Sequence, residues 1–316
     1  MLHVRTASGE EVASLSGDNF QTGLDLKRHL RTLHGYPVSL QKLVYDGRLL
    51  DDDDVDVPEV GEVQLILLAK ANEEVDSEMW HTAGRELVAY AGRHGHLESA
   101  RFLLRAGVDK DYYCDFEDAA ALTLAARHGH SEMVRLLVDE GSDFKEAGLL
   151  AAAMAGHAQV VRLLLDADAC EDDIALTRRA LQDAVFFGHA EVVRLLVEAG
   201  AKPDWQGYHD GRTALMRAVA RGHTEIARCL VDAGANKDLR NTAGVTALML
   251  AAVYGHTEIA RLLVEAGADT EVVDSQGRTA LEHARLRTRR SHAKIAALLQ
   301  EATHNASGTK VKRPRL

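Results

Sequence analysis

The sequence predicts two parts: a small α+β domain in residues 1–70 and an all-α solenoid of helix pairs in residues 80–302. Three observations lead to this prediction. A Gly-His dipeptide recurs about every 33 residues, each copy carries two apolar stripes at helical spacing, and the first seventy residues alternate with the two-residue period of strands. Residues 71–79 are expected to form a linker, and the basic tail, residues 303–316, to be disordered.

The Gly-His repeat defines the solenoid. Its glycines are Gly95, Gly129, Gly156, Gly188, Gly222 and Gly255, at intervals of 34, 27, 32, 34 and 33 residues. The clearest copies begin at Gly211 and Gly244, and a further copy begins at Gly277 with three extra residues before its second helix, which gives about seven copies in all. Since one helix pair of this size cannot bury its own apolar stripe, neighbouring pairs must stack.

Local signals set the ends of the helices. Thr246 is placed to accept a hydrogen bond from a free amide at the start of the first helix of its repeat. Gly255 and Gly267 follow the two helices, where a left-handed residue can end them. The short interval lies around residues 141–147, so we expect the third repeat to lack a full β-finger and the surface to be interrupted there.

The repeated segment resembles ankyrin repeats. It departs from the family's Thr-Pro-Leu-His opening, which reads Thr-Ala-Leu-Met from Thr213 and Thr246 and Thr-Ala-Leu-Glu from Thr279. Alanine favours the helix but does not preset its first turn as proline does. We therefore expect softer junctions between repeats than in a consensus array.

The first seventy residues predict strand, strand, helix, strand, short strand and strand. The helix is expected between Thr22, a natural N-cap, and His34, and Asp46-Gly47 predicts a hairpin turn. The segment resembles ubiquitin and its β-grasp relatives in a set of matching residues, namely Gly35, Pro37, Gln41, Leu43, Gly47 and Leu50.

The ubiquitin resemblance is weaker in residues 51–61, and the last strand is not followed by Gly-Gly. It therefore implies a built-in module that docks a ubiquitin-pathway receptor, such as the proteasome or a ubiquitin ligase, and not a conjugated modifier. The alternation of the strands places Val44, Ile66 and Leu68 on the outer face of the sheet, where they resemble the recognition patch of ubiquitin. The alternatives are that these are ordinary exposed apolar residues or that the first repeat covers them.

The ankyrin resemblance implies that ligands meet the β-fingers and the two residues before each Gly-His, which we call the pre-Gly-His positions. These positions are basic in the first copies and apolar or aromatic later: Arg93, His94, Arg127, His128, Met154, Ala155, Phe186, Phe187, Ala220, Arg221, Val253 and Tyr254. The aromatic finger residues are Tyr112, Tyr113, Phe116, Trp205 and Tyr208, with His209 beside them. The alternatives are that Phe186 fills space left by the short third repeat and that the fingers pack on one another.

Several function classes are disfavoured by the sequence. It contains no phosphate-binding, dinucleotide-binding, nucleophile-elbow or zinc-protease motif, so neither an enzyme nor a cofactor is expected. The Gly-His histidines lie a repeat apart and should bond nearby backbone instead of converging on a metal. No apolar run approaches the roughly 20 residues that a membrane helix needs, and the net charge of −11 disfavours nucleic acid.

Two functions remain open. The first is an adaptor, whose repeats bind a protein while the ubiquitin-like domain docks a ubiquitin-pathway receptor. The second is a plain scaffold whose N-terminal domain covers the end of the solenoid. The missing leader and the odd, scattered cysteines predict a cytoplasmic protein, and the tail residues Lys310, Lys312, Arg313 and Arg315 resemble a nuclear import signal.

Overall fold

The computed structural model divides into two compact units, Met1–Ala151 and Ala152–Leu316, which are described separately. The residues it describes are 2–6, 11–15, 20, 22–34, 36, 38, 41–45, 48–50, 61–67, 77–169, 174–207 and 209–309.

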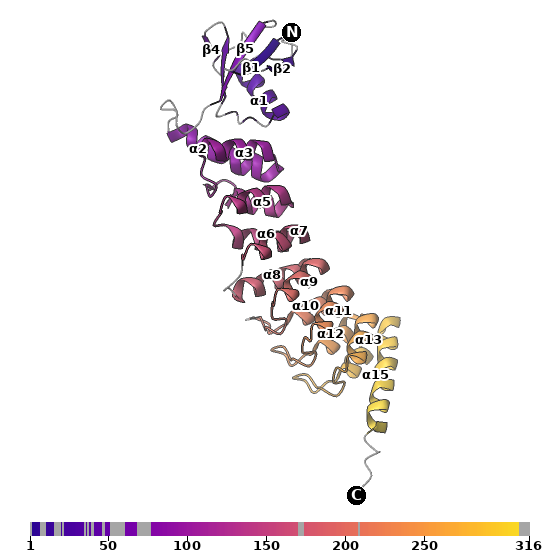
Figure 1. Cartoon of the computed structure of the whole chain (residues 1–316). Coiled ribbons are helices and arrows are strands. Elements are labelled where there is room, and N and C mark those ends of the chain that lie inside the picture. The colour runs from indigo at the N-terminus through magenta and orange to yellow at the C-terminus, as the bar shows by residue number, and fades with distance from the viewer. Residues whose placement is uncertain are drawn as a thin grey trace. The chain divides into compact units, whose positions relative to one another are not determined.

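The first unit begins with a five-stranded mixed sheet (Figure 1). Its strands are β1 (Leu2–Thr6), β2 (Glu11–Leu15), β3 (Gln41–Tyr45), β4 (Arg48–Leu50) and β5 (Gly61–Leu67), in the order β2-β1-β5-β3-β4. The pair β1–β5 is parallel and the other pairs are antiparallel. One helix, α1 (Gly23–His34), packs on the sheet and shares its core, which contains Leu2, Val4, Leu26, Leu30, Leu43, Leu50, Val63 and Leu65.

The predicted order of elements in this domain is confirmed. Thr22 caps α1, since its hydroxyl accepts a hydrogen bond from the Asp25 amide at 3.1 Å and the Asp25 carboxylate accepts one from the Thr22 amide at 3.2 Å. Tyr45 pairs with Arg48, as a two-residue hairpin requires. The turn residues Asp46 and Gly47 lie outside the described residues, as do Gly35 and Pro37.

The remainder of both units consists mainly of helices. The first repeat contains α2 (Ser77–Glu86), a π-helical segment η3 (Leu87–Gly92) and α3 (Leu97–Ala106), so the helical part begins at Ser77 instead of residue 80. The short strands β6 (Tyr113–Cys114) and β7 (Ala119–Ala120) form the next finger. The later helices are α4 (Ala121–His128), α5 (Ser131–Asp139), α6 (Lys145–Ala155), α7 (Ala158–Asp166), α8 (Ile174–Phe187), α9 (Ala190–Glu198), α10 (Ala214–Arg221), α11 (Thr224–Asp232), α12 (Ala247–Tyr254), α13 (Thr257–Glu265), α14 (Ala280–Arg285) and α15 (Arg290–Thr309).

Helix ends follow the sequence signals. Thr213, Thr246 and Thr279 each accept a hydrogen bond from the backbone amide three residues on, at 3.2 to 3.3 Å. Gly255 has φ +79°, a left-handed angle that ends α12. The prediction of a missing finger is also confirmed, because only residues 140–144 separate α5 from α6, whereas residues 199–213 separate α9 from α10.

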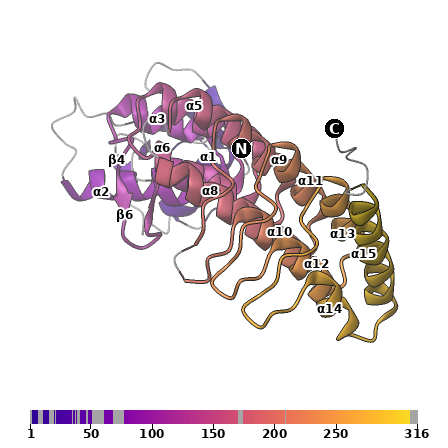
Figure 2. The same cartoon turned by 90° about the horizontal axis from the view of Figure 1, so that it is seen from below.

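In the second unit the helices lie in two rows, with α8, α10, α12 and α14 in one and α9, α11 and α13 in the other (Figure 2). Small and branched side chains fill the space between the rows, with Ala218, Ala227, Ala251 and Ala260 all fully buried. The expected tail boundary is wrong in part, because α15 continues through Thr309 and residues 303–309 are therefore helical.

Candidate binding surface

Two of the Gly-His histidines connect neighbouring repeats through hydrogen bonds to the backbone. In the first unit His130 Nε2 lies 2.9 Å from the carbonyl oxygen of Arg93. In the second unit His189 Nε2 lies 3.0 Å from the carbonyl oxygen of Met154. Because a carbonyl oxygen can only accept, Nε2 is the protonated ring nitrogen in each pair. The prediction of histidines bonded to backbone is confirmed for His130 and His189, and each bond holds a pre-Gly-His position of the preceding repeat.

Glycine is needed beside these imidazole rings. A Cβ built on Gly156 would lie 2.5 Å from His189 Nδ1, and one built on Gly95 would lie 2.7 Å from the His130 ring. Both glycines also have positive φ angles. In each dipeptide the glycine therefore leaves space for the histidine ring of the next repeat, and the histidine ring occupies the space beside the glycine of the preceding repeat. The pre-Gly-His side chains stay out of the core.

In the first unit the pre-Gly-His positions are basic and exposed. Arg93 Nη1 lies 2.9 Å from Glu117 Oε1 in the following finger. Burial lowers the pKa of His128, and electrostatic interactions with His130 and Arg93 lower it further. His128 is therefore mainly neutral at pH 7, whereas Arg93 and Arg127 carry a permanent positive charge on this surface.

In the second unit the same positions carry aromatic side chains and an arginine. Phe186 and Phe187 are 43% and 50% exposed, with their rings 5.1 Å apart in an edge-to-face arrangement. The guanidinium carbon of Arg221, from the next repeat, lies 3.5 Å from the centre of the Phe186 ring. Tyr254 is 46% exposed and stacks on His256. The alternative that Phe186 fills internal space is wrong, because its ring lies at the surface against Arg221.

The finger residues differ in exposure. Phe116 is 97% exposed, and Tyr113 is 44% exposed with its hydroxyl donating to Asp118. Tyr112 is half-buried, and its ring occupies the space beside Gly84, so it packs on α2. The other predicted finger residues lie in the second unit.

Trp205 is half-buried under Arg178, whose guanidinium carbon lies 4.5 Å from the centre of its ring. Tyr208 lies outside the described residues. Trp205 therefore shares its face with a cation from its own chain.

The predicted patch on the ubiquitin-like domain is described only in part. Val44 is half-buried, and it follows Leu43, which is buried in the core. The register pairs Leu43 with Leu65, and both side chains are buried, as the predicted alternation requires. Leu68 lies outside the described residues.

The ubiquitin-like domain contacts the first repeat, as one of the two open alternatives required, through residues that were not predicted. The side chain of Glu86, 8% exposed, accepts a hydrogen bond from the Val38 amide at 2.9 Å and lies 3.4 Å from Arg31 Nη1. The guanidinium of Arg31 also lies 4.1 Å from the centre of the Tyr90 ring, on the π-helical segment. The sequence offered no signal, since a glutamate and an arginine 55 residues apart look like ordinary surface charges.

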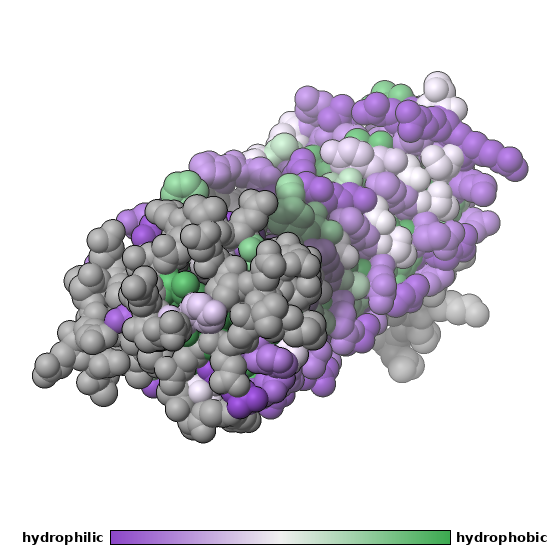
Figure 3. Space-filling view, turned by 90° about the horizontal axis from the view of Figure 1, so that it is seen from above, coloured by the Kyte–Doolittle hydropathy of each residue, from purple (hydrophilic) through white to green (hydrophobic). Residues whose placement is uncertain are grey.

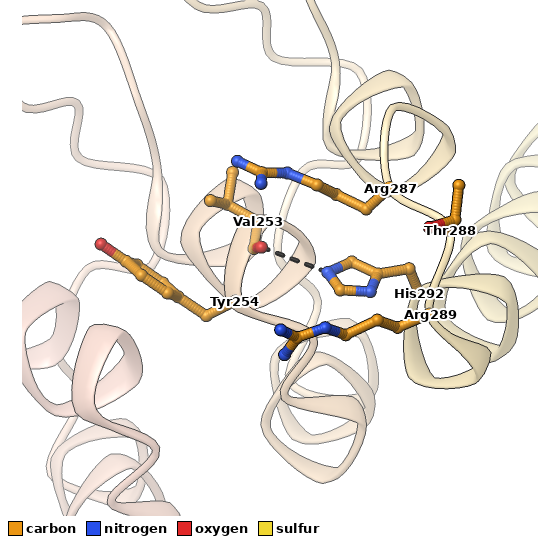
Figure 4. A pocket seen from close by; sticks show the side chains of 6 residues that line it. All are labelled: Val253, Tyr254, Arg287, Thr288, Arg289 and His292. Atoms are coloured by element: carbon orange, nitrogen blue, oxygen red, sulfur yellow. Dashed lines mark hydrogen bonds between the residues drawn. The ribbon is translucent and has the colours of Figure 1, made fainter.

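A second unpredicted feature is a pocket of about 330 Å³ near the end of the second unit (Figure 4). It is lined by Val253, Tyr254, Arg287, Thr288, Arg289 and His292, and we call it the arginine pocket. Val253 and Tyr254 were predicted as binding residues, whereas the others were not. The available signal was the three-residue insertion in the last repeat, which falls in a run of arginines.

The described residues contain no group of three or more metal-ligating side chains, and none of their helices is long and apolar enough to cross a membrane. In the face drawn in Figure 3, hydrophilic side chains occupy much of the coloured surface, with apolar atoms between them. The exposed aromatic and cationic positions, held by a rigid helical array, are features of a repeat protein that binds other molecules through its surface.

Comparisons with known proteins agree with this class. A family model described as ankyrin repeats (3 copies) matches residues 59–148, 122–206, 149–241 and 215–309, and the chain belongs to the ankyrin-repeat family. A second model, the ubiquitin family, matches residues 2–61, so the N-terminal domain is ubiquitin-like. The overlapping matches do not establish the predicted count of seven repeats.

Among solved structures, the chain is similar to the ankyrin repeat domain of Bcl-3, described as a unique member of the IkappaB protein family. The identity is 27%, the TM-score is 0.57, and the match covers 66% of this chain and 96% of that one. No curated protein matches. The ankyrin-repeat fold typically serves as a non-enzymatic scaffold for protein interactions, which is the class of function that these findings support.

Proposed function

We propose that this protein is a non-enzymatic adaptor whose ankyrin repeats, seven if each helix pair is counted as one, bind a protein partner. The observation that carries the proposal is the row of exposed groups on consecutive repeats of the second unit, Phe186, Arg221 and Tyr254. None of them is needed to fill the core, and aromatic and arginine side chains dominate the energy of protein interfaces. A partner segment that offers apolar and acidic side chains would match this row.

The experiment is a cross-linking pull-down from cells with the full chain, comparing wild type with Phe186→Ala/Phe187→Ala. We expect the double variant to lose a defined set of partners. The control is Ile174→Ala, which removes an exposed apolar side chain, 63% exposed, at the opposite end of the same helix. Identical partner sets for all three proteins, each folded by circular dichroism, would refute the role of the aromatic pair.

We also propose that the ubiquitin-like domain docks a ubiquitin-pathway receptor, such as a proteasome or ligase component. The support is that the contacts described above between this domain and the first repeat involve Arg31, Tyr36 and Val38, on α1 and the segment after it, whereas Val44 lies on β3. The outer position of Val44 on β3 therefore remains available to a partner. Substituting Val44, Ile66 and Leu68 together by alanine should remove ubiquitin-pathway proteins from the pull-down, and an unchanged set would exclude this docking mode.

A structural role of the same domain is the second candidate, and one specific observation favours it. In the first repeat, Glu86 accepts a hydrogen bond from the Val38 amide and pairs with Arg31, which also lies over the Tyr90 ring. These contacts place the domain over part of the terminal repeat. Terminal repeats need such a cover or a polar face. If this is its only role, the triple-alanine variant will keep every partner while deletion of residues 1–70 destabilises the first repeat.

For location we propose the cytoplasm, with import into the nucleus through Lys310, Lys312, Arg313 and Arg315, which lie outside the described residues. A fluorescent fusion with these four residues changed to alanine should then be depleted from nuclei.

A further inference from the structure

The connection between α14 and α15 departs from the repeat pattern. Where earlier repeats have Gly-His, the last has Ser291-His292, after an insertion that contains Arg287, Thr288 and Arg289. His292 still occupies the place of the Gly-His ring, since its Nε2 lies 3.2 Å from the Val253 carbonyl oxygen. A Cβ built on Gly255 would lie 3.0 Å from the same ring. The inserted residues therefore add a loop to the surface without displacing the histidine.

This loop concentrates positive charge. Arg285, Arg287, Arg289 and Arg290 are all exposed, and within the described part of the chain none of the four forms an ion pair. Arg278, in the preceding finger, instead binds the Asp274 carboxylate at 2.8 Å. The chain has a net charge of −11, so these four arginines within six residues form a positively charged region on an otherwise acidic protein.

The arginine pocket gives this charge a defined shape. Figure 4 shows the Arg287 and Arg289 side chains extending on either side of the Val253–His292 hydrogen bond, toward the side on which Tyr254 lies. His292 is 3% exposed, and its hydrogen bond to Val253 fixes the position of the loop. A cavity of about 330 Å³ is within the range of ligand pockets. Thr288, which also lines the pocket, carries a hydroxyl group that can hydrogen-bond an anion.

We propose that the arginine pocket binds anionic side chains of a partner protein, supplied by a cluster of carboxylates or by a phosphorylated residue. Arginine suits this role because its planar guanidinium can donate two parallel hydrogen bonds to a carboxylate or phosphate. A protein segment is favoured over nucleic acid, because the positive charge is confined to one pocket and the chain as a whole is acidic. This proposal deepens the proposed function by naming one chemical class that the repeats recognise.

The test measures fluorescence anisotropy of three labelled twelve-residue peptides with the full-length protein. They share one Gly/Ser sequence and carry four glutamates, two phosphoserines or neither. We expect one or both anionic peptides to bind and the neutral one not to bind, and the anionic peptide that binds identifies the source of the charge. Arg287→Gln/Arg289→Gln should weaken binding about tenfold, since it removes two charge-assisted contacts.

Two further variants control the test. Arg135→Gln/Arg261→Gln removes the same charge from exposed helix positions and should change affinity less than about twofold, because such sites are screened by solvent. Arg287→Lys/Arg289→Lys keeps the charge without the planar donor pair and should give intermediate affinity. All substituted positions are exposed, so thermal unfolding should match wild type.

The proposal is overturned if neither anionic peptide binds, or if Arg135→Gln/Arg261→Gln loses as much affinity as Arg287→Gln/Arg289→Gln. It is also overturned if a twenty-nucleotide single strand displaces the labelled peptide at a lower concentration than the unlabelled peptide does. Self-association abolished by Arg287→Gln/Arg289→Gln would instead assign the pocket to a second copy of the chain. Failure here is distinguishable from failure of the proposed function, because the latter is tested through Phe186 and Phe187.

Discussion

In the contact between the ubiquitin-like domain and the first repeat, the Glu86 carboxylate interacts with both the Val38 amide and Arg31. Substitution Glu86→Ala removes the acceptor of the Val38 amide and the partner of Arg31 in a site where the Glu86 side chain is 8% exposed. Leaving a buried donor unsatisfied costs about 1–3 kcal/mol, with more for a charged partner, and the Val38 amide is partly buried. Arg31 is 27% exposed and can turn to water, so we expect a total of about 2–3 kcal/mol.

Hydrogen exchange of the Val38 amide measures this loss of stability at the contact itself. In Glu86→Ala the Val38 amide should exchange about 30- to 150-fold faster, because each 1.4 kcal/mol corresponds to a factor of ten in the opening equilibrium. Glu86→Gln keeps a neutral acceptor, so its exchange rate at the Val38 amide should lie between those of wild type and Glu86→Ala. The control Glu98→Ala, at a side chain that is 78% exposed, should leave this amide unchanged. Unchanged exchange in Glu86→Ala would refute the reasoning, and with it the covering role of the domain.

Two predictions concern the second unit. Gly156→Ala should lower the free energy of unfolding in urea by about 2–3 kcal/mol, because the new Cβ would lie 2.5 Å from the His189 ring and because the φ angle is positive. The control Gly234→Ala has a similar φ angle but open space around it, so it should cost only about 1 kcal/mol. Equal costs for the two variants would exclude the explanation that the His189 ring requires glycine at position 156. Asp274→Asn should cost about 2 kcal/mol at pH 7, because the buried carboxylate accepts hydrogen bonds from His283 and Arg278. Burial raises the pKa of Asp274, but hydrogen bonds from the Arg278 and Gln276 amides and from the Arg278 and His283 side chains outweigh it and hold the pKa below the ordinary value. Its stabilisation is therefore complete above about pH 4 and is lost as pH falls toward the folded-state pKa, so the wild-type advantage should shrink at pH 3; a gap that is constant with pH would contradict this assignment.

The sequence was sufficient for features that depend on neighbouring residues. The caps at Thr22 and Thr246, the helix end at Gly255 and the missing third finger are local consequences of side-chain and backbone chemistry, and the structure has all of them. The expectation that Gly-His histidines bond to backbone is likewise met by His130 and His189. Their partner, the carbonyl of the preceding repeat, could be identified only once the stacking of repeats was known.

Contacts between distant surface charges were beyond sequence reasoning. Glu86 and Arg31 meet because the ubiquitin-like domain sits on the π-helical first repeat, and no periodicity encodes that meeting. The helical continuation to Thr309 was missed because the polar composition of residues 303–309 resembles a disordered tail, whereas extension of an existing helix adds a hydrogen bond for each residue without a new nucleus. The arginine pocket was missed because an insertion in a repeat was considered for its length and not for its charge.

The division of roles within each Gly-His segment explains where specificity can reside. Glycine and histidine fix the backbone between repeats: the glycine leaves space for the histidine ring of the next repeat, and that ring bonds a backbone carbonyl, as His189 does beside Gly156. The two residues before them therefore have little part in packing, and their chemistry can change from repeat to repeat without disturbing the array. It does change, from arginine and histidine in the first unit to paired phenylalanines in the second. In the last repeat the inserted loop adds arginines while His292 keeps the backbone bond, so new surface chemistry is gained at a position where the fold tolerates it.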